Sequence, residues 1–112
     1  MNRTEALGEF EQTVLLAIVH AGPGAYGVRI RREIEDRTGR DVSVGALYTA
    51  IDRLERKGLV RSTNSEPTPQ RGGRSKRFVA LTAAGAQALE RSRETMQRMW
   101  AGLRPGLLRP RS

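Results

Sequence analysis

Several residue types that support common kinds of chemistry are absent or rare in this chain of 112 residues. It has no cysteine and a single histidine, His20. The lack of cysteine excludes thiol catalysis and cysteine-based zinc sites, and it is consistent with a reducing compartment. One histidine with no cysteine beside it also argues against a zinc centre or a histidine-based catalytic site. We therefore expect no bound metal and no cofactor.

Long hydrophobic stretches are missing as well. The longest apolar run, residues 14–19, is far too short to span a bilayer, and residues 1–10 lack the apolar segment of a signal peptide. The chain contains neither a phosphate-binding glycine signature nor a nucleophile elbow. These absences predict a cytoplasmic protein that is not an enzyme and has no membrane partner.

Positive charge is abundant and unevenly placed. Basic residues outnumber acidic ones by 20 to 12, for a net charge of +8. Residues 1–52 carry a net charge of −2, residues 53–77 carry +6 and residues 78–112 carry +4. Codon bias would explain the preference for arginine over lysine, but not this clustering. A polyanion would meet the middle of the chain, and nucleic acid is the commonest such partner.

Apolar residues recur at spacings of three and four in three early segments. This period predicts helices over residues 7–21, 25–38 and 44–57. Gly39 is suited to the left-handed position after the second helix, and Ser43 is a good N-cap for the third. A helix, a short connection and a crossing helix form a helix-turn-helix, whose second helix enters the major groove of DNA.

The hydrophobic period then changes to that of β-strands. Residues 59–63 and 76–81 are predicted as two strands, joined by a loop that is longer than a hairpin needs. The expected fold is α+β and mainly helical. It is a winged helix-turn-helix of three helices and a two-stranded wing, which occupies residues 1–81 as a DNA-binding domain.

A final helix is predicted over residues 82–104, with Thr82 as its cap and Pro105 after its end. A helix of about 20 residues spans roughly 30 Å, more than a small three-helix core requires. Part of its apolar stripe is therefore expected to form a homodimer, although the helix could instead fold back onto its own core. Residues 105–112 are expected to be a disordered tail. The predicted interface residues are Leu89, Met96, Trp100 and Leu103.

The third helix and the wing carry the predicted DNA contacts. Small residues at the start of the third helix allow close approach, and its free backbone N–H groups suit a phosphate. Tyr48 is equally compatible with a core position, and Ser43 is expected to act both as a cap and as a contact. The candidates on this helix are Ser43, Gly45, Tyr48, Thr49 and Arg53; those in the wing are Arg71, Arg74, Lys76 and Arg77.

The order and spacing of several fragments resemble the PadR family of bacterial transcription regulators. The resemblance covers residues 7–85 and rests on Tyr26-Gly27, Ser43-Val44-Gly45-Ala46-Leu47-Tyr48, Leu54-Glu55-Arg56-Lys57-Gly58-Leu59-Val60, Gly73-Arg74-Ser75-Lys76-Arg77-Phe78 and Leu81-Thr82-Ala83-Ala84-Gly85. It implies a winged helix, a dimer formed by the C-terminal helix, and repression that a small ligand relieves. The chain departs from the family pattern at Val28, Val44 and Ala46.

The same resemblance implies further site residues. Tyr26 would lie at or near DNA. The single short C-terminal helix is similar to that of the compact branch of the family, in which interface aromatics take up flat apolar molecules. Phe10, Met96 and Trp100 would form such a site here, although Trp100 is equally well explained by ordinary interface packing.

The sequence thus leaves three functions to compare. The first is a regulator, most simply a repressor, that binds a pseudo-palindromic site in double-stranded DNA as a homodimer and answers to a small-molecule effector. The second is a non-specific nucleic-acid-binding protein, and the third is a protein–protein adaptor with a winged-helix scaffold. The concentration of charge around the wing favours the first.

Overall fold

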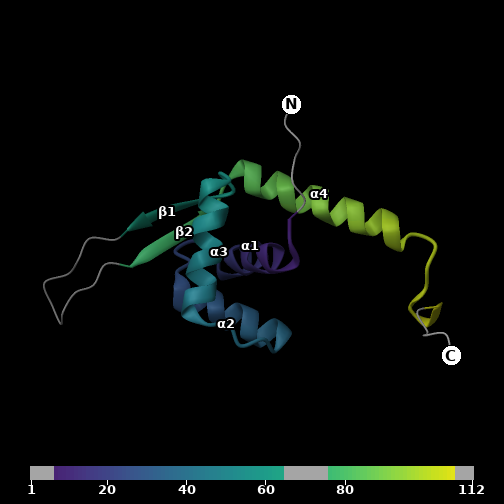
Figure 1. The fold of residues 1–112 in the computed structure, drawn as a ribbon, viewed down its shortest axis with the longest axis horizontal. Helices are drawn as coiled ribbons and strands as arrows, with labels where there is room; N and C mark the ends of the chain where they lie inside the picture. The colour runs from purple at the N-terminus through teal and green to yellow at the C-terminus, as the bar shows by residue number, and fades with distance from the viewer. Residues whose placement is uncertain (1–6, 65–75, 108–112) are drawn as a thin grey trace, which may run out of the picture.

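The computed structural model describes residues 7–64 and 76–107. In Figure 1 the helices of the first half of the chain lie beside a two-stranded antiparallel sheet, and a later helix extends away from the sheet. This is the predicted winged-helix architecture, and the fold class is confirmed. The elements are α1 (Glu9–Ala21), α2 (Gly27–Thr38), α3 (Val44–Arg56), β1 (Val60–Asn64), β2 (Arg77–Leu81), α4 (Ala83–Trp100) and the 3-10 helix η1 (Pro105–Leu107).

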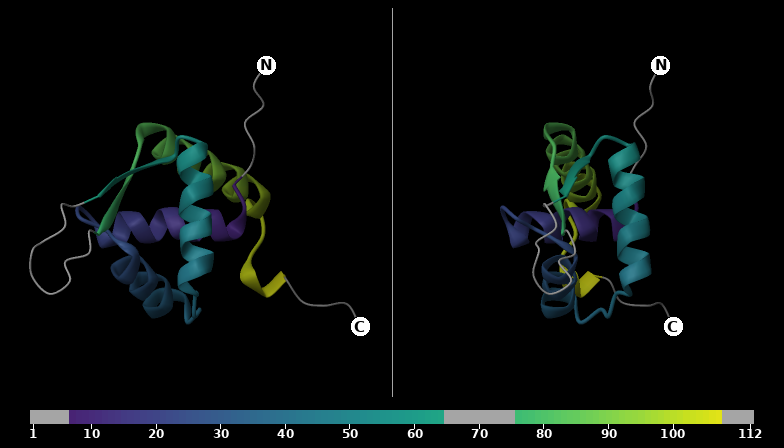
Figure 2. Two further views of the ribbon diagram at one scale, coloured as in Figure 1. Left: turned by 60° about the vertical axis from the view of Figure 1, so that its left-hand side comes forward. Right: turned by 90° about the vertical axis from the view of Figure 1, so that its left-hand side faces the viewer.

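The connection between α2 and α3 is short and tightly held. Gly39 ends α2 in the left-handed conformation with φ 75°, which glycine adopts without steric cost. The Arg31 side chain donates a hydrogen bond from Nε to the Val42 carbonyl at 2.8 Å. Ser43 Oγ accepts the Ala46 N–H at 3.0 Å, as expected of an N-cap. These contacts fix the direction in which α3 leaves α2 (Figure 2).

The core lies where the apolar faces of α1, α2 and α3 meet the inner face of the sheet. Its largest side chains are fully buried, and each stabilises the fold by about 1.5–3 kcal/mol relative to exposure. Apolar residues at helical spacing are what direct these faces inward. The core side chains are Val14, Leu15 and Ile18 from α1, Ile30 and Ile34 from α2, Leu47, Ile51 and Leu54 from α3, and Val60 and Val79 from the sheet.

The sheet is wider at its base than the sequence predicts. Strands β1 and β2 pair in the register Val60↔Leu81 to Asn64↔Arg77. The segment before α2 joins them, because Tyr26 forms a bridge with Phe78 and the Val79 N–H donates to the Ala25 carbonyl at 2.9 Å. This third stretch holds the start of α2 against the wing.

Helix α4 begins at a firmly anchored turn. Thr82 Oγ1 accepts the Gly85 N–H at 3.0 Å and donates to the Gly58 carbonyl at 2.7 Å. A Cβ atom at position 85 would overlap the carbonyl oxygen of Leu59. Glycine is therefore required at this position, because the first turn of α4 packs directly on the backbone before β1.

The end of α4 differs from the prediction. The helix was expected to reach residue 104, but it ends at Trp100, and Ala101 is extended with φ −57° and ψ 133°. Gly102 then has φ 84°, a left-handed conformation that ends the helix before Pro105 does. The predicted interface residue Leu103 therefore lies beyond α4. The tail expected to lack structure begins instead with η1.

Candidate nucleic-acid interface

The first two turns of α3 present an open surface. Ser43, Gly45 and Thr49 are all exposed. A Cβ at position 45 would have nothing within 4 Å, so the packing of the chain does not require glycine there. The neighbouring Val44 side chain is 52% exposed. The structure thus brings these predicted contacts together at the helix end, where the unpaired backbone N–H groups also lie.

Tyr48 connects α3 to the start of α2. Its ring is half-buried against the core, and its hydroxyl lies where a Cβ of Gly27 would stand. The Arg77 guanidinium is 5.7 Å from the centre of the same ring. Tyr48 therefore has a packing role, one of the two interpretations that the sequence allowed. Its contact with DNA stays a prediction.

Two predicted residues far apart in sequence meet beside the N-terminus of α2. Lys76 places its Nζ 4.4 Å from the centre of the Tyr26 ring, within the range of a cation–π interaction. The Tyr26 ring also meets Phe78 edge-on, with centroids 6.2 Å apart. A positive charge from the base of the wing is thereby held next to the first turn of α2.

Arg77 follows Lys76 but lies on the opposite face of the strand. Its Nη2 is 2.9 Å from Asp52 Oδ1 and 2.8 Å from Glu55 Oε1, both on α3. Its Nε donates to Ser62 Oγ at 3.0 Å. The charge of Arg77 is thus directed at two carboxylates of the same chain. Strand alternation, with a period of two, could have separated Arg77 from Lys76 in the sequence.

Glu55 belongs to the same cluster. It accepts a hydrogen bond from Ser62 Oγ at 3.1 Å as well as the bond from Arg77. The hydrogen bond from Ser62 lowers the pKa of Glu55, and the bond and charge of Arg77 lower it further, which outweighs the opposing effect of burial. Glu55 is therefore held in its ionised form.

Arg53 lies on the exposed face of α3, four residues beyond Thr49. Its charge acts on Glu11 of α1, which is 8% exposed and pairs with Lys57 at 2.9 Å. Burial raises the pKa of Glu11, but the Lys57 and Gly8 hydrogen bonds and the charges of Lys57 and Arg53 bring it below its ordinary value. Contact between Arg53 and DNA stays a prediction.

The remaining wing candidates, Arg71 and Arg74, lie outside the described residues. Among residues 7–64 and 76–107, no group of histidine, aspartate and glutamate side chains is placed to hold a metal ion. Over the same ranges, no helix is long and apolar enough to cross a membrane.

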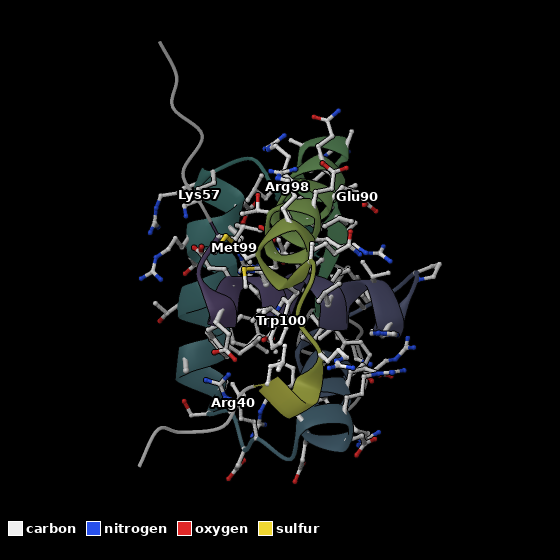
Figure 3. The ribbon with its side chains drawn as sticks, turned by 90° about the vertical axis from the view of Figure 1, so that its right-hand side faces the viewer. Arg40, Lys57, Glu90, Arg98, Met99 and Trp100 are labelled. Atoms are coloured by element: carbon white, nitrogen blue, oxygen red, sulfur yellow. The ribbon has the colours of Figure 1, made fainter. Side chains whose placement is uncertain are left out.

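A second surface lies between α1 and α4. An open groove of about 690 Å³ is lined by apolar side chains from both helices, among them Leu16, Val19, Leu89, Met96 and Trp100. Met96 and Trp100 remain about half exposed, and from residue 93 to residue 100 every side chain of α4 is exposed. Figure 3 shows Trp100 on the side of α4 toward the body of the molecule, with Arg98 on the opposite side.

The predicted grouping of Phe10 with Met96 and Trp100 stays a prediction, because it concerns an interface between two copies. Phe10 does not line this groove. It packs against the core, and the Arg40 guanidinium lies 5.2 Å from the centre of its ring. The groove contains Leu16 and Val19 instead, which the sequence analysis missed. Their signal was available, because the run of residues 14–19 is apolar all round the helix and cannot be buried completely on one side.

Comparison with known proteins identifies the family. The family model described as "Transcriptional regulator PadR-like family" matches residues 15–91. The chain belongs to this PadR-like family. The match runs from α1 through the wing into α4, and the resemblance inferred from the sequence fragments is confirmed.

One curated relative of this PadR-like chain is an uncharacterized 37.1 kDa protein in transposon TN4556 of Streptomyces fradiae. The two are 36% identical over 88 residues, which is 79% of this chain. The chain spans only 23% of the length of that relative.

Solved structures share the fold of the PadR-like chain. The complex structure of hsRosR-S1 is 29% identical, with a TM-score of 0.65 over 86% of this chain and 78% of that one. A PadR family transcription regulator from hypervirulent Clostridium difficile R20291 has a TM-score of 0.70 at 22% identity, over 91% and 100%. F93 from STIV, a winged-helix DNA-binding protein, has a TM-score of 0.65 at 24% identity, over 88% and 98%.

Proposed function

We propose that this PadR-like chain is a repressor that binds a pseudo-palindromic operator in double-stranded DNA. One observation carries the proposal. The start of α3, with Ser43, Gly45 and Thr49 exposed, lies in a fold whose second helix-turn-helix element enters the major groove. Tyr26 and Lys76 flank α2 at the base of the wing, where they suit a phosphate of the same duplex.

The proposed active form is a homodimer built on α4. From residue 93 to residue 100 every side chain of this helix is exposed, and Met96, Trp100 and Leu103 are apolar side chains about half exposed. A second copy related by a two-fold axis would cover them, and the same axis would place two copies of α3 on half-sites about one helical turn apart.

The groove between α1 and α4 is the proposed place for an effector. Its lining is mainly apolar, and Trp100 and Met96 offer an aromatic face and a polarizable side chain to a flat apolar molecule. Such a ligand would act by binding one arrangement of the two copies better than another, which shifts the population that fits DNA.

The operator proposal is tested by selection and titration. The wild-type protein is used to select a duplex from a pool of random sequence, and its affinity for that duplex is compared with its affinity for a shuffled duplex at physiological salt. We expect a preference of at least about a thousandfold. Equal affinities would indicate the non-specific alternative instead.

The adaptor alternative predicts a different effect of substitutions in the wing. An adaptor would lose nothing when the wing charges are removed, so R74A/K76A would leave its function unchanged. A repressor with these substitutions should lose affinity for every duplex. The presence of Lys76 beside the N-terminus of α2 favours the repressor.

A further inference from the structure

Arg77 is a charged side chain with several partners beside the recognition helix α3. Its guanidinium lies within 3.0 Å of Asp52, Glu55 and Ser62. The sequence pattern nevertheless groups it with the basic residues of the wing that are predicted to contact DNA. Isolated surface ion pairs contribute little, but this one is a network that joins β1, β2 and α3. Its position in the strand explains the direction of the side chain.

Alternation along β2 determines where Arg77 points. Val79 is buried in the core, and Arg77, two residues earlier, lies on the same face of the strand. Lys76 and Phe78 lie on the other face, where both contact Tyr26. Arg77 is thus placed against α3, while the charge of Lys76 is placed toward the surface.

The two carboxylates that Arg77 meets are poorly suited to a DNA-binding helix. Asp52 follows Gly45 by seven residues and Thr49 by three, so it lies on the same face of α3 as these proposed contacts. The side chains of Asp52 and Glu55 are 53% and 42% exposed even with Arg77 in place. Without a cation they would present two negative charges to the DNA phosphates.

We propose that Arg77 is a positioning residue that neutralises Asp52 and Glu55 on the recognition helix and fixes the base of the wing to it, without binding DNA itself. The inference rests on the proposed DNA binding. It assigns the two basic residues at the base of the wing to different tasks: Lys76 faces the phosphates, and Arg77 removes an electrostatic obstacle to them.

A set of charge variants tests the inference on the duplex selected by the wild-type protein. R77M should weaken binding at least about tenfold, because two uncompensated carboxylates then oppose the phosphates. R77M/D52N/E55Q should recover to within about threefold of the wild type, since neither the cation nor the anions remain. Fluorescence anisotropy over a range of salt concentrations measures both the affinity and its salt dependence.

Two outcomes would overturn the assignment. Wild-type affinity in R77M would mean that Asp52 and Glu55 need not be neutralised for DNA binding. A triple variant as weak as R77M, with a salt slope lower by about 0.9, would mean that Arg77 contacts a phosphate directly. If wild-type protein selects no duplex at all, the proposed operator binding fails, and this result is distinct from either of the others.

Two further variants guard against a folding artefact. D52N/E55Q keeps Arg77 and removes the two negative charges, so the proposal predicts that it binds DNA at least as tightly as the wild type. A tenfold loss of affinity would contradict the inference even if R77M did not fold. K57M/E11Q removes an ion pair of 2.9 Å that joins the C-cap of α3 to α1, without changing the net charge. It should leave DNA affinity unchanged, and thermal melting reports the folding of each variant.

Discussion

The wing side and the α4 side of this molecule differ in how far their side chains are paired or buried within one copy. Around the wing, the charged side chains Lys76 and Arg77 already have partners within the chain. Along α4, the apolar side chains Met96 and Trp100 are left half exposed beside an open groove. Polar groups can be satisfied by water or by one another, whereas exposed apolar surface is stabilised only by further burial. The charged side chains Lys76 and Arg77 are thus satisfied within one copy, whereas the exposed apolar side chains of α4 are where the proposed second copy would bind.

Removing the largest side chain of the α4 surface should have the largest effect. Trp100→Ala is expected to weaken dimerisation by about 2 kcal/mol or more, roughly thirtyfold, because central aromatic residues dominate interface energies. Sedimentation at micromolar concentration would show the lower mass. Arg98→Ala is the matched control on the opposite side of α4 (Figure 3). A dimer unchanged by Trp100→Ala would place the interface elsewhere.

Removing the surface charge of the wing should have a smaller and more uniform effect. Lys76→Ala is expected to weaken binding to every duplex and to lower the salt slope by about one unit, since a phosphate contact carries no sequence information. Arg53→Ala is expected instead to change the preference at one base pair. Titrations of single-base variants of the selected duplex distinguish the two. Identical behaviour would mean that Arg53 does not read a base.

Gly45 offers a test in which stability and binding move in opposite directions. Gly45→Ala should stabilise the fold by about 0.5–1 kcal/mol, because alanine is the better helix former and the added Cβ meets nothing within 4 Å. The same methyl group would stand between α3 and a closely approaching duplex, so DNA affinity should fall. Urea unfolding and anisotropy measure the two effects. A stabilised variant with unchanged affinity would show that DNA does not approach position 45.

Acid should lower the stability of the fold gradually. The pKa values of Glu11 and Glu55 are lowered in the folded chain, so the unfolded state binds more protons near their ordinary pKa of about 4.3. The free energy of unfolding therefore falls as the pH drops below about 5, and this contribution is lost once the pH passes below the folded pKa values. Urea midpoints from pH 6 to pH 3 should fall less steeply in Glu55→Gln. An identical slope in this variant would contradict the assignment.

Local sequence signals predicted most of the elements because their causes are local. Ser43 caps α3 and Gly39 ends α2 as expected, since a cap or a left-handed residue depends on only a few neighbours. The length of helix α4 was overestimated because the end was predicted from Pro105, a strong stop signal, whereas the helix already breaks before Gly102. Glycine permits a break without requiring one, so the sequence did not locate it.

The candidate site was predicted only in part, because several of its contacts join segments that are distant in the sequence. Composition identified the basic segment, but composition does not distinguish the adjacent Lys76 and Arg77, whose opposite directions follow from the alternation along β2. The contact between Lys76 and Tyr26 was equally hidden, because it joins two segments fifty residues apart. The contact of Phe10 with Arg40 was not predicted, because helical position alone does not say which neighbour a side chain meets.

By itself the sequence determined the winged-helix architecture, the family and the excess of positive charge near the wing, because periodicity, caps and composition are properties of neighbouring residues. Tertiary structure alone decided which charges remain available and which apolar residues remain uncovered. The reason is that burial and ion pairing depend on segments distant in the chain. Arg77 meets α3 across the sheet, and Leu16 of α1 lines the same groove as Trp100 of α4.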